Sequence, residues 1–334
     1  MKTISVVTPC FNEADNILEC YMEVKRVFAE SLPNYRREHV FCDNCSTDQT
    51  VAILKDIARQ DPSVRIIVNA RNFGPMRSTY NGVLATTGDA VLLFLPADLQ
   101  DPPERLPEFV TLWESGYEIV YGIRTVREES ALMQAVRNLY YRLLTSGSDL
   151  NIPPGVGDFQ LVDRKVINAM RQIDDVYPFM RMMTFECGFR SVGVPCTWKA
   201  RKRGVSKNQI KHLLDQGMNG FTTYSKIPLR ISLYGGFIVA ALSIIYAVLS
   251  AIIGMIFYRN IASPGIMTLI TSMFFFAGVQ LFFLGTIGEY ILQIYAQVRR
   301  TPLVIERERI NFENTVPLTE AAIQATKNNK TETQ

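Results

Sequence analysis

Residues that could bind an anionic ligand or a metal ion follow each of four short apolar segments near the N-terminus. Carboxylates, amides and arginines recur in these polar stretches, which are Pro9–Glu13, Asp43–Asp48, Arg71–Gly74 and Pro96–Pro103. A single stretch is weak evidence, because a residue such as Asp48 could simply cap the helix that follows. Four such stretches in succession are harder to explain as helix caps. We therefore predict that their side chains form one binding site.

The segments around these stretches predict alternating strands and helices. Short runs rich in β-branched residues indicate strands at Ile4–Thr8, His39–Cys42, Val64–Val68, Ala90–Leu95 and Glu118–Tyr121. Apolar residues at helical spacing predict helices at Asp15–Ser31, Asp48–Arg59, Met76–Thr86 and Pro103–Ser115. Repeated strand–helix–strand units favour an α/β fold with a mostly parallel sheet. Because ligands of such sheets bind at the carboxyl ends of the strands, the four polar stretches lie where a site is expected.

Two later segments contain no Asp, Glu, Lys or Arg. They run from Ile231 to Tyr258 and from Asn260 to Gly288. A helix of about 20 apolar residues crosses a bilayer, so we predict two transmembrane helices joined by a short turn. A pair of buried core helices is the alternative. Basic residues flank both segments, which by the positive-inside rule places both termini in the cytosol.

Two amphipathic segments could lie on the membrane surface. Apolar residues recur at helical spacing over 206–225 and again over 131–144, with basic residues among them. The first segment stands just before a predicted spanning helix, which favours an interfacial helix over ordinary core packing. For the second segment the two interpretations are about equally good.

Composition excludes several other classes of protein. With 35 Lys+Arg against 32 Asp+Glu the net charge is only +3, which is too balanced for a general nucleic-acid binder. Six cysteines without a secretion signal indicate reduced thiols. Cys42 and Cys45 have the spacing of a metal pair, but neither a second cysteine pair nor a nearby histidine completes four ligands. The chain also lacks the glycine-rich signatures of dinucleotide-binding and P-loop proteins.

In this order, the polar stretches resemble those of the family 2 glycosyltransferases that act on polyprenyl phosphates. The resemblance extends through Gly157-Asp158-Phe159-Gln160 and a basic Gly204-Val205-Ser206-Lys207 segment, and it covers about residues 3 to 310. This family includes the bactoprenol-phosphate glucosyltransferases of O-antigen modification and dolichol-phosphate mannose synthase. The resemblance implies inverting transfer of a sugar, glucose by default, from a nucleotide sugar such as UDP-glucose to undecaprenyl or another polyprenyl phosphate.

The resemblance also implies an organisation and a location. A glycosyltransferase A-type catalytic domain over 1–200 would be followed by a basic segment with an interfacial helix over 201–228, two transmembrane helices over 229–292 and a cytosolic tail over 293–334. The protein would lie in the cytoplasmic (inner) membrane of a bacterium. It would form a homotetramer in contact with membrane lipids.

Roles for single residues follow from the same resemblance. The nucleotide sugar would be bound by Pro9, Phe11, Asn12, Glu13, Asp43, Asn72, Gly74, Arg77 and Asp98. Asp98 and Gln100 would hold Mg²⁺ or Mn²⁺, because both ions prefer oxygen ligands. Asp98 and Asp158 would be the catalytic residues. The lipid phosphate and the diphosphate would be contacted by Arg201, Arg203, Ser206 and Lys207.

Three departures from the family pattern keep a second function open. The usual Asp-x-Asp begins here with Pro96, Asp-Asp-Gly-Ser reads Asp43-Asn44-Cys45-Ser46, and Pro75 follows Arg-Asn-Phe-Gly. A catalytically weakened chain that binds or translocates a sugar lipid is therefore the alternative. A processive polysaccharide synthase is disfavoured, because the Gln-x-x-Arg-Trp motif of such enzymes is absent.

Overall fold

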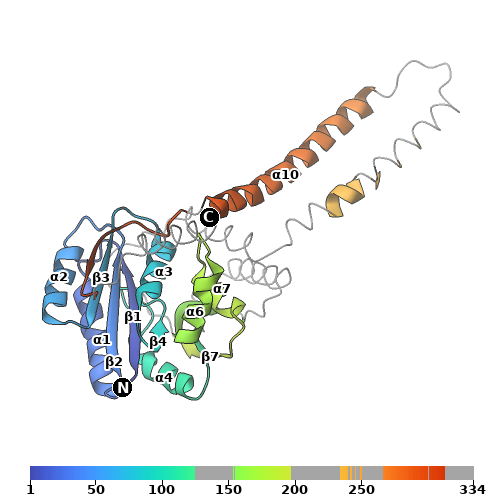
Figure 1. Ribbon diagram of the computed structural model, residues 1–334. Helices are drawn as coiled ribbons and strands as arrows, with labels where there is room; N and C mark the ends of the chain where they lie inside the picture. The colour runs from blue at the N-terminus through green and yellow to red at the C-terminus, as the bar shows by residue number, and fades with distance from the viewer. Residues whose placement is uncertain are drawn as a thin grey trace, which may run out of the picture.

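The fold is an eight-stranded sheet between two layers of helices, which confirms the predicted α/β class (Figure 1). It was obtained as a computed structural model. The structure describes residues 1–124, 153, 155–196, 234–239, 241–242, 245, 249, 266–299 and 301–312. Within this part of the chain the strand order is β7-β5-β6-β4-β1-β2-β3-β8.

The strands and helices predicted for residues 4–121 are all present, with shifted ends. The strands are β1 (Thr3–Cys10), β2 (Arg36–Asp43), β3 (Val64–Asn69), β4 (Ala90–Leu92), β5 (Ile119–Arg124), β6 (Val156–Asp163), β7 (Ser191–Cys196) and β8 (Glu306–Ile310). The helices are α1 (Ile17–Ser31), α2 (Thr50–Gln60), α3 (Pro75–Ala85), α4 (Leu106–Glu114), α6 (Arg164–Ile173), α7 (Met180–Glu186) and α10 (Ile266–Val298). A 3₁₀ turn over Pro103–Arg105 precedes α4.

The sheet is mostly parallel, as predicted, with antiparallel pairs at β6 and β8. Strand β1 pairs in parallel with β2 and β4, and β2 pairs in parallel with β3. Strand β6 runs antiparallel to both β4 and β5, while β7 is parallel to β5. The carboxyl ends of β1 to β4 therefore share one edge of the sheet, as the sequence predicted, and the polar stretches follow them there.

Strand β8 lies inside the segment 293–334, for which we predicted a cytosolic tail. Residues 306–310 pair antiparallel with β3 at the end of the sheet. The sequence Glu-Arg-Glu-Arg-Ile does not show the apolar alternation of a half-buried strand. Its charges are matched by the domain: Glu308 pairs with Lys55 at 2.7 Å, and Asn81 donates to Glu306 at 2.6 Å.

Each face of the sheet packs against its own helices. Helices α1, α2 and α4 cover one face, around side chains such as Phe41 and Phe109. Helices α3, α6 and α7 cover the other. Helix α3 approaches β2 so closely that a Cβ atom at Gly82 would lie 2.1 Å from the Sγ of Cys42, so only glycine fits there. This packing holds α3, which begins just after one of the polar stretches, against the sheet.

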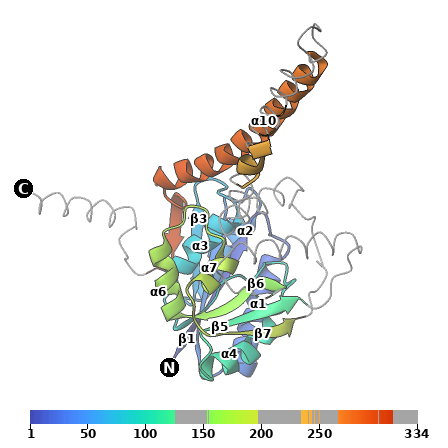
Figure 2. The same cartoon turned by 90° about the vertical axis from the view of Figure 1, so that its right-hand side faces the viewer.

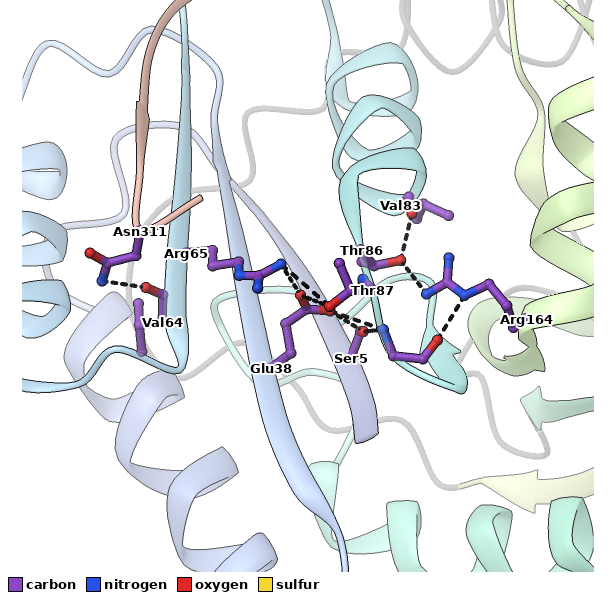
Figure 3. A network of polar contacts seen from close by, with 10 residues as sticks. Ser5, Glu38, Val64, Arg65, Val83, Thr86, Thr87, Arg164 and Asn311 are labelled. Atoms are coloured by element: carbon purple, nitrogen blue, oxygen red, sulfur yellow. Dashed lines mark hydrogen bonds and ion pairs between the residues drawn. The ribbon is translucent and has the colours of Figure 1, made fainter. Parts of the chain in front are cut away.

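The amino ends of the same strands are joined by a buried polar network (Figure 3). Glu38, which is 4% exposed, accepts hydrogen bonds from Ser5 Oγ and from the backbone and side chain of Thr87, and it forms an ion pair with Arg65. The backbone N–H of Gly88 donates to Ser5 Oγ at 3.0 Å. This network lies at the edge of the sheet opposite the polar stretches, so we assign it to stability.

A second buried titratable group, His39, makes stability depend on pH. Burial, aided by the charge of Arg37, holds the pKa of the His39 imidazole well below its usual value near 6.5. The unfolded chain therefore takes up a proton that the folded chain does not, and stability falls as the pH drops below about 6.5. Between pH 6.5 and 5 we expect a loss of about 2 kcal/mol. Between pH 6.5 and 5, the unfolding midpoint of His39→Gln should change less with pH than that of the wild type. An equal change in both proteins would show that His39 is not the cause of the pH dependence.

Helix α10 leaves the domain on the side opposite the N-terminus (Figures 1 and 2). Since β1 begins near the N-terminus, this is the side on which β1 to β4 end. Residues Phe275–Val298 are long and apolar enough to cross a membrane, and side chains such as Leu281 and Ile291 are exposed. Among the described residues this is one candidate span where two were predicted. Most of 231–258 lies outside them, as do the predicted surface segments 131–144 and 206–225.

Candidate functional site

The loops after β1 and β2 are bound to each other by side chains from both. The backbone N–H of Asn12 donates to Ser46 Oγ at 2.8 Å, and the N–H of Thr47 donates to Asn12 Oδ1 at 2.7 Å. The N–H of Glu13 donates to Thr50 Oγ1 at 2.9 Å. These contacts bring the Pro9–Glu13 stretch, with Phe11 in it, against the Asp43–Asp48 stretch. The first two polar stretches therefore form one surface, as predicted.

Asp43 lies at the base of this surface. Its side chain has no exposed area, and its Oδ2 accepts a hydrogen bond from the Ser46 N–H at 3.0 Å. Burial raises the pKa of Asp43, while hydrogen bonds from Ser46 and Cys45 and the charge of Arg307 oppose the rise. Cys45 has a φ of +67°, in the left-handed region that favours glycine. Glycine is the residue that the family pattern has at this position.

An amide network joins the ends of β2 and β3. Asn44 Nδ2 donates to Asn72 Oδ1 at 2.8 Å, and the N–H of Gly74 donates to the same oxygen at 2.9 Å. Asn69 Nδ2 donates to Asn44 Oδ1 at 3.2 Å. Gly74 has a φ of +87°, which explains a glycine immediately before α3. Asn72 and Gly74 therefore lie beside Asp43, and the third polar stretch joins the first two.

Arg77 is bound to the segment that follows α10. Its Nη2 donates to the carbonyl oxygen of Pro302 at 2.7 Å, and its guanidinium lies over the rings of Phe73 and Tyr177. A cavity of about 510 Å³ lies at this junction, lined by Asp174, Asp175, Val176, Gln297, Val298, Thr301, Pro302 and Leu303. None of the predicted site residues lines this cavity. We therefore do not treat it as the donor site.

The stretch after β4 places two side chains with oxygen atoms, Asp98 and Gln100, on one tight turn. The backbone N–H of Gln100 donates to Asp98 Oδ1 at 3.3 Å, and Leu99 between them has a φ of +54°. Bulky residues in this region are rare and cluster at functional sites. Among the described residues no group of three or more His, Cys, Asp or Glu side chains could hold a metal ion. Asp98 and Gln100 fit an ion that takes its remaining oxygens from a diphosphate and from water.

Asp158, on β6, is held by an arginine that the sequence did not identify. Arg181 on α7 donates from Nε to Asp158 Oδ1 at 3.0 Å and from Nη2 to Oδ2 at 2.5 Å. Both side chains are largely buried, at 12% exposed for Asp158 and 16% for Arg181. Such a two-point contact fixes the plane of the carboxylate. The signal that could have found Arg181 is a lone charge in the apolar run from Phe179 to Phe185.

The remaining predicted residues lie outside the described part of the chain. They are Arg201, Arg203, Ser206 and Lys207. The structure therefore brings together the residues predicted in the loops after β1, β2 and β3, and Asp98 and Gln100 follow the neighbouring β4. Arg77, on α3, is bound instead to the segment after α10. Such an edge, with amides and buried Asp43 on one side and Asp98 and Gln100 on the other, offers hydrogen-bonding groups to a polar ligand and oxygen atoms to a cation bound with it.

Comparisons with known proteins agree with this arrangement. Residues 5–171, which run from β1 into α6, match the family model described as glycosyl transferase family 2. The chain is 34% identical over 311 residues to an uncharacterized glycosyltransferase of Bacillus subtilis, covering 93% of this chain and 95% of the relative. It is 32% identical over 307 residues to the bactoprenol glucosyl transferase of Shigella phage SfX, covering 92% and 99%.

One solved structure is similar over most of the chain. A mannosyltransferase from Pyrobaculum calidifontis, in complex with GDP-Man and Mn²⁺, aligns with a TM-score of 0.45 at 17% identity, covering 89% of this chain and 86% of that one.

Proposed function

Because the chain belongs to glycosyl transferase family 2 and is a glycosyltransferase, we propose that it transfers glucose from UDP-glucose to undecaprenyl or another polyprenyl phosphate. The product would serve the modification of a cell-surface glycan of the O-antigen type. The observation that carries the proposal is the similarity to bactoprenol glucosyl transferases, which spans the domain and the apolar helix alike. The choice of glucose rests on these relatives' names, and the choice of UDP rests on the family resemblance of the sequence motifs.

The donor would bind across the carboxyl ends of β1 to β4. Its nucleoside would lie against the stretches that carry Phe11, Asn12, Asp43 and Asn72. Asp98 and Gln100 would hold Mg²⁺ or Mn²⁺ at the diphosphate. The ion would supply positive charge that stabilises the departing diphosphate.

Asp158 would act on the acceptor side of the reaction. A phosphate monoester has a second pKa near 6, so the acceptor is already an anionic nucleophile at pH 7 and scarcely needs a general base. We infer that Asp158 instead orients the acceptor or offsets the positive charge that develops on the sugar as the bond to the diphosphate breaks. Attack from the face opposite the leaving diphosphate inverts the anomeric carbon. Arg181 would keep the carboxylate in position for this role.

The membrane part would bring the acceptor to the site. A polyprenyl tail stays in the bilayer, so its phosphate must be met at the membrane surface. We propose that α10 is the second helix of a transmembrane hairpin over 229–292, in a bacterial inner membrane with both termini in the cytosol. Arg201, Arg203, Ser206 and Lys207 would attract the anionic lipid head. Small residues such as Gly235 and Gly278 would allow close contact between helices in a homotetramer.

Pro96 supports one alternative. It stands where the family pattern has the first acid of Asp-x-Asp, so metal binding could be weaker than in an active enzyme. The chain would then bind or translocate a sugar lipid without making it.

A transfer assay separates the two functions. Membranes containing the chain are incubated with polyprenyl phosphate and a panel of radiolabelled UDP- and GDP-sugars, and the lipid is extracted and counted. We expect label in the lipid from UDP-glucose, release of nucleotide that depends on added acceptor, and loss of the signal in Asp98→Ala. Binding of sugar lipid without transfer would favour the alternative. Full transfer by Asp98→Ala would refute the metal assignment.

A further inference from the structure

Strand β8 contains a β-bulge beside the carboxyl end of β3. Val68 pairs with Glu308, but the next residue of β3, Asn69, pairs with Glu306. Arg307 is therefore the extra residue on β8. Bulges redirect the side chain of the extra residue and are frequent next to active sites. This bulge lies at the same edge of the sheet as the candidate site.

Arg307 differs from the other charged residues of its strand. Glu306 and Arg309 form an ion pair with each other, and Glu308 pairs with Lys55. Arg307 is exposed, and it makes no hydrogen bond or ion pair with another residue that the structure describes. Three of the four charges on β8 are thus in ion pairs, and the fourth, Arg307, is exposed at the edge of the sheet where the site lies.

Asp43 shows in which direction the charge of Arg307 acts. Burial raises the pKa of the Asp43 carboxyl group, and the charge of Arg307 is among the influences that oppose this rise. Two strand spacings separate β8 from β2, a distance of about 10 Å that an extended arginine side chain largely covers. In the register of the sheet Asp43 pairs with Val68 and Val68 with Glu308, so Arg307 lies one residue along β8 from the row that contains Asp43.

We propose that Arg307 binds the nucleoside of the sugar nucleotide donor, an inference that rests on the proposed function. The strand order separates two halves of the site: β2, β3 and β8 lie on one side of β1, and β4, with Asp98 and Gln100 after it, lies on the other. Arg307 is thus on the side away from the diphosphate. A guanidinium group donates up to five hydrogen bonds, which suits the carbonyl oxygens of a base and the hydroxyl oxygens of a ribose.

This role makes the chain beyond the apolar helix part of the donor site. The backbone of that segment is anchored next to Arg307, since the N–H of Ala70 donates to the carbonyl of Ile305 at 2.8 Å. Asn311 Nδ2 donates to the carbonyl of Val64 at 2.9 Å at the other end of the strand (Figure 3). The bulge is therefore held at both ends.

Nucleotide binding to the purified full chain in nanodiscs tests the proposal. Titration calorimetry would first measure binding of UDP and UMP, and of GDP and GMP, to the wild type. The variants would then be measured with whichever of the two pairs binds more tightly. We expect Arg307→Ala to weaken the diphosphate and the monophosphate by the same factor, about tenfold, because the lost contact is to the nucleoside. Arg307→Lys should lose less, since it keeps one charged donor. Arg36→Ala, which removes an exposed arginine at the amino end of β2, should bind normally.

The possible results separate this inference from the function on which it rests. Unchanged affinity in Arg307→Ala would overturn the role of Arg307 alone. So would a loss seen with the diphosphate but not with the monophosphate, which would move the contact to the diphosphate. Failure of the wild-type chain to bind any of these nucleotides would overturn the proposed function together with the inference. Thermal unfolding of Arg307→Ala should match the wild type, which excludes misfolding as the cause of weaker binding.

Discussion

Asp158→Asn should lower kcat by a factor of about 10²–10³ and leave the KM for the donor nearly unchanged. Removal of a charge that acts at the transition state typically has an effect of this size. Asparagine keeps the shape of the side chain, but it no longer carries the negative charge that would face the developing positive charge on the sugar. The measurement is the steady-state rate of transfer to polyprenyl phosphate at varied donor concentration, with the purified chain in nanodiscs. Near-full turnover would refute the role of Asp158.

Variants around Asp158 separate chemistry from positioning. Arg181→Lys keeps a positive charge beside Asp158 but cannot contact both carboxylate oxygens. We expect it to lower kcat less than Asp158→Asn does, with nucleotide affinity unchanged. The control is Glu186→Gln, which removes a carboxylate from an exposed position on the same helix as Arg181. Equal losses in Glu186→Gln and Asp158→Asn would indicate a general effect on α7.

Glu38→Ala should destabilise the domain by about 3–5 kcal/mol, the usual cost of removing one partner of a buried ion pair. The variant leaves the Arg65 guanidinium unpaired, and it also removes the acceptor for the N–H of Thr87, bonded at 2.9 Å, and for the Thr87 hydroxyl, bonded at 2.8 Å. Denaturant unfolding of the full chain in detergent, followed by tryptophan fluorescence from Trp113 and Trp198, measures the change.

An exposed ion pair provides the control for Glu38. Glu30 pairs with Arg26 on the surface of α1 at 3.0 Å, with 59% of the Glu30 side chain exposed. Pairs of this kind contribute at most about 1 kcal/mol, so Glu30→Ala should shift the unfolding midpoint little. If the two variants unfolded at the same denaturant concentration, the network around Glu38 would have no special role in stability.

The sequence predicted the half of the fold in which one local pattern repeats. Each of β1 to β4 is an apolar run followed by a polar stretch, and the parallel pairing of these strands brings the stretches to one edge. The sequence alone therefore predicts that Asn12, Asp43 and Asn72 lie near one another.

The parts that the sequence did not predict depend on contacts between distant segments. Arg181 contacts Asp158 from 23 residues away, and no spacing rule connects a strand residue to a helix residue at that separation. Strand β8 pairs with β3, which lies far earlier in the chain. Because β8 consists mostly of charged residues, it lacks the apolar alternation by which a strand is predicted. Arg307 could not be identified as a site residue, because its position depends on a bulge in that pairing.

The short segment between α10 and β8 limits where the enzyme can work. Helix α10 ends at Val298 and β8 begins at Glu306. An extended chain of that length spans at most roughly 28 Å, and the bond from Gln297 to the carbonyl of Asp174, at 2.6 Å, holds the helix end against the domain. With α10 in a bilayer, the donor would remain within the length of this connecting segment from the lipid surface. A bare phosphate stays within that reach, whereas the tip of a growing glycan moves away, so the geometry favours addition of one sugar per lipid.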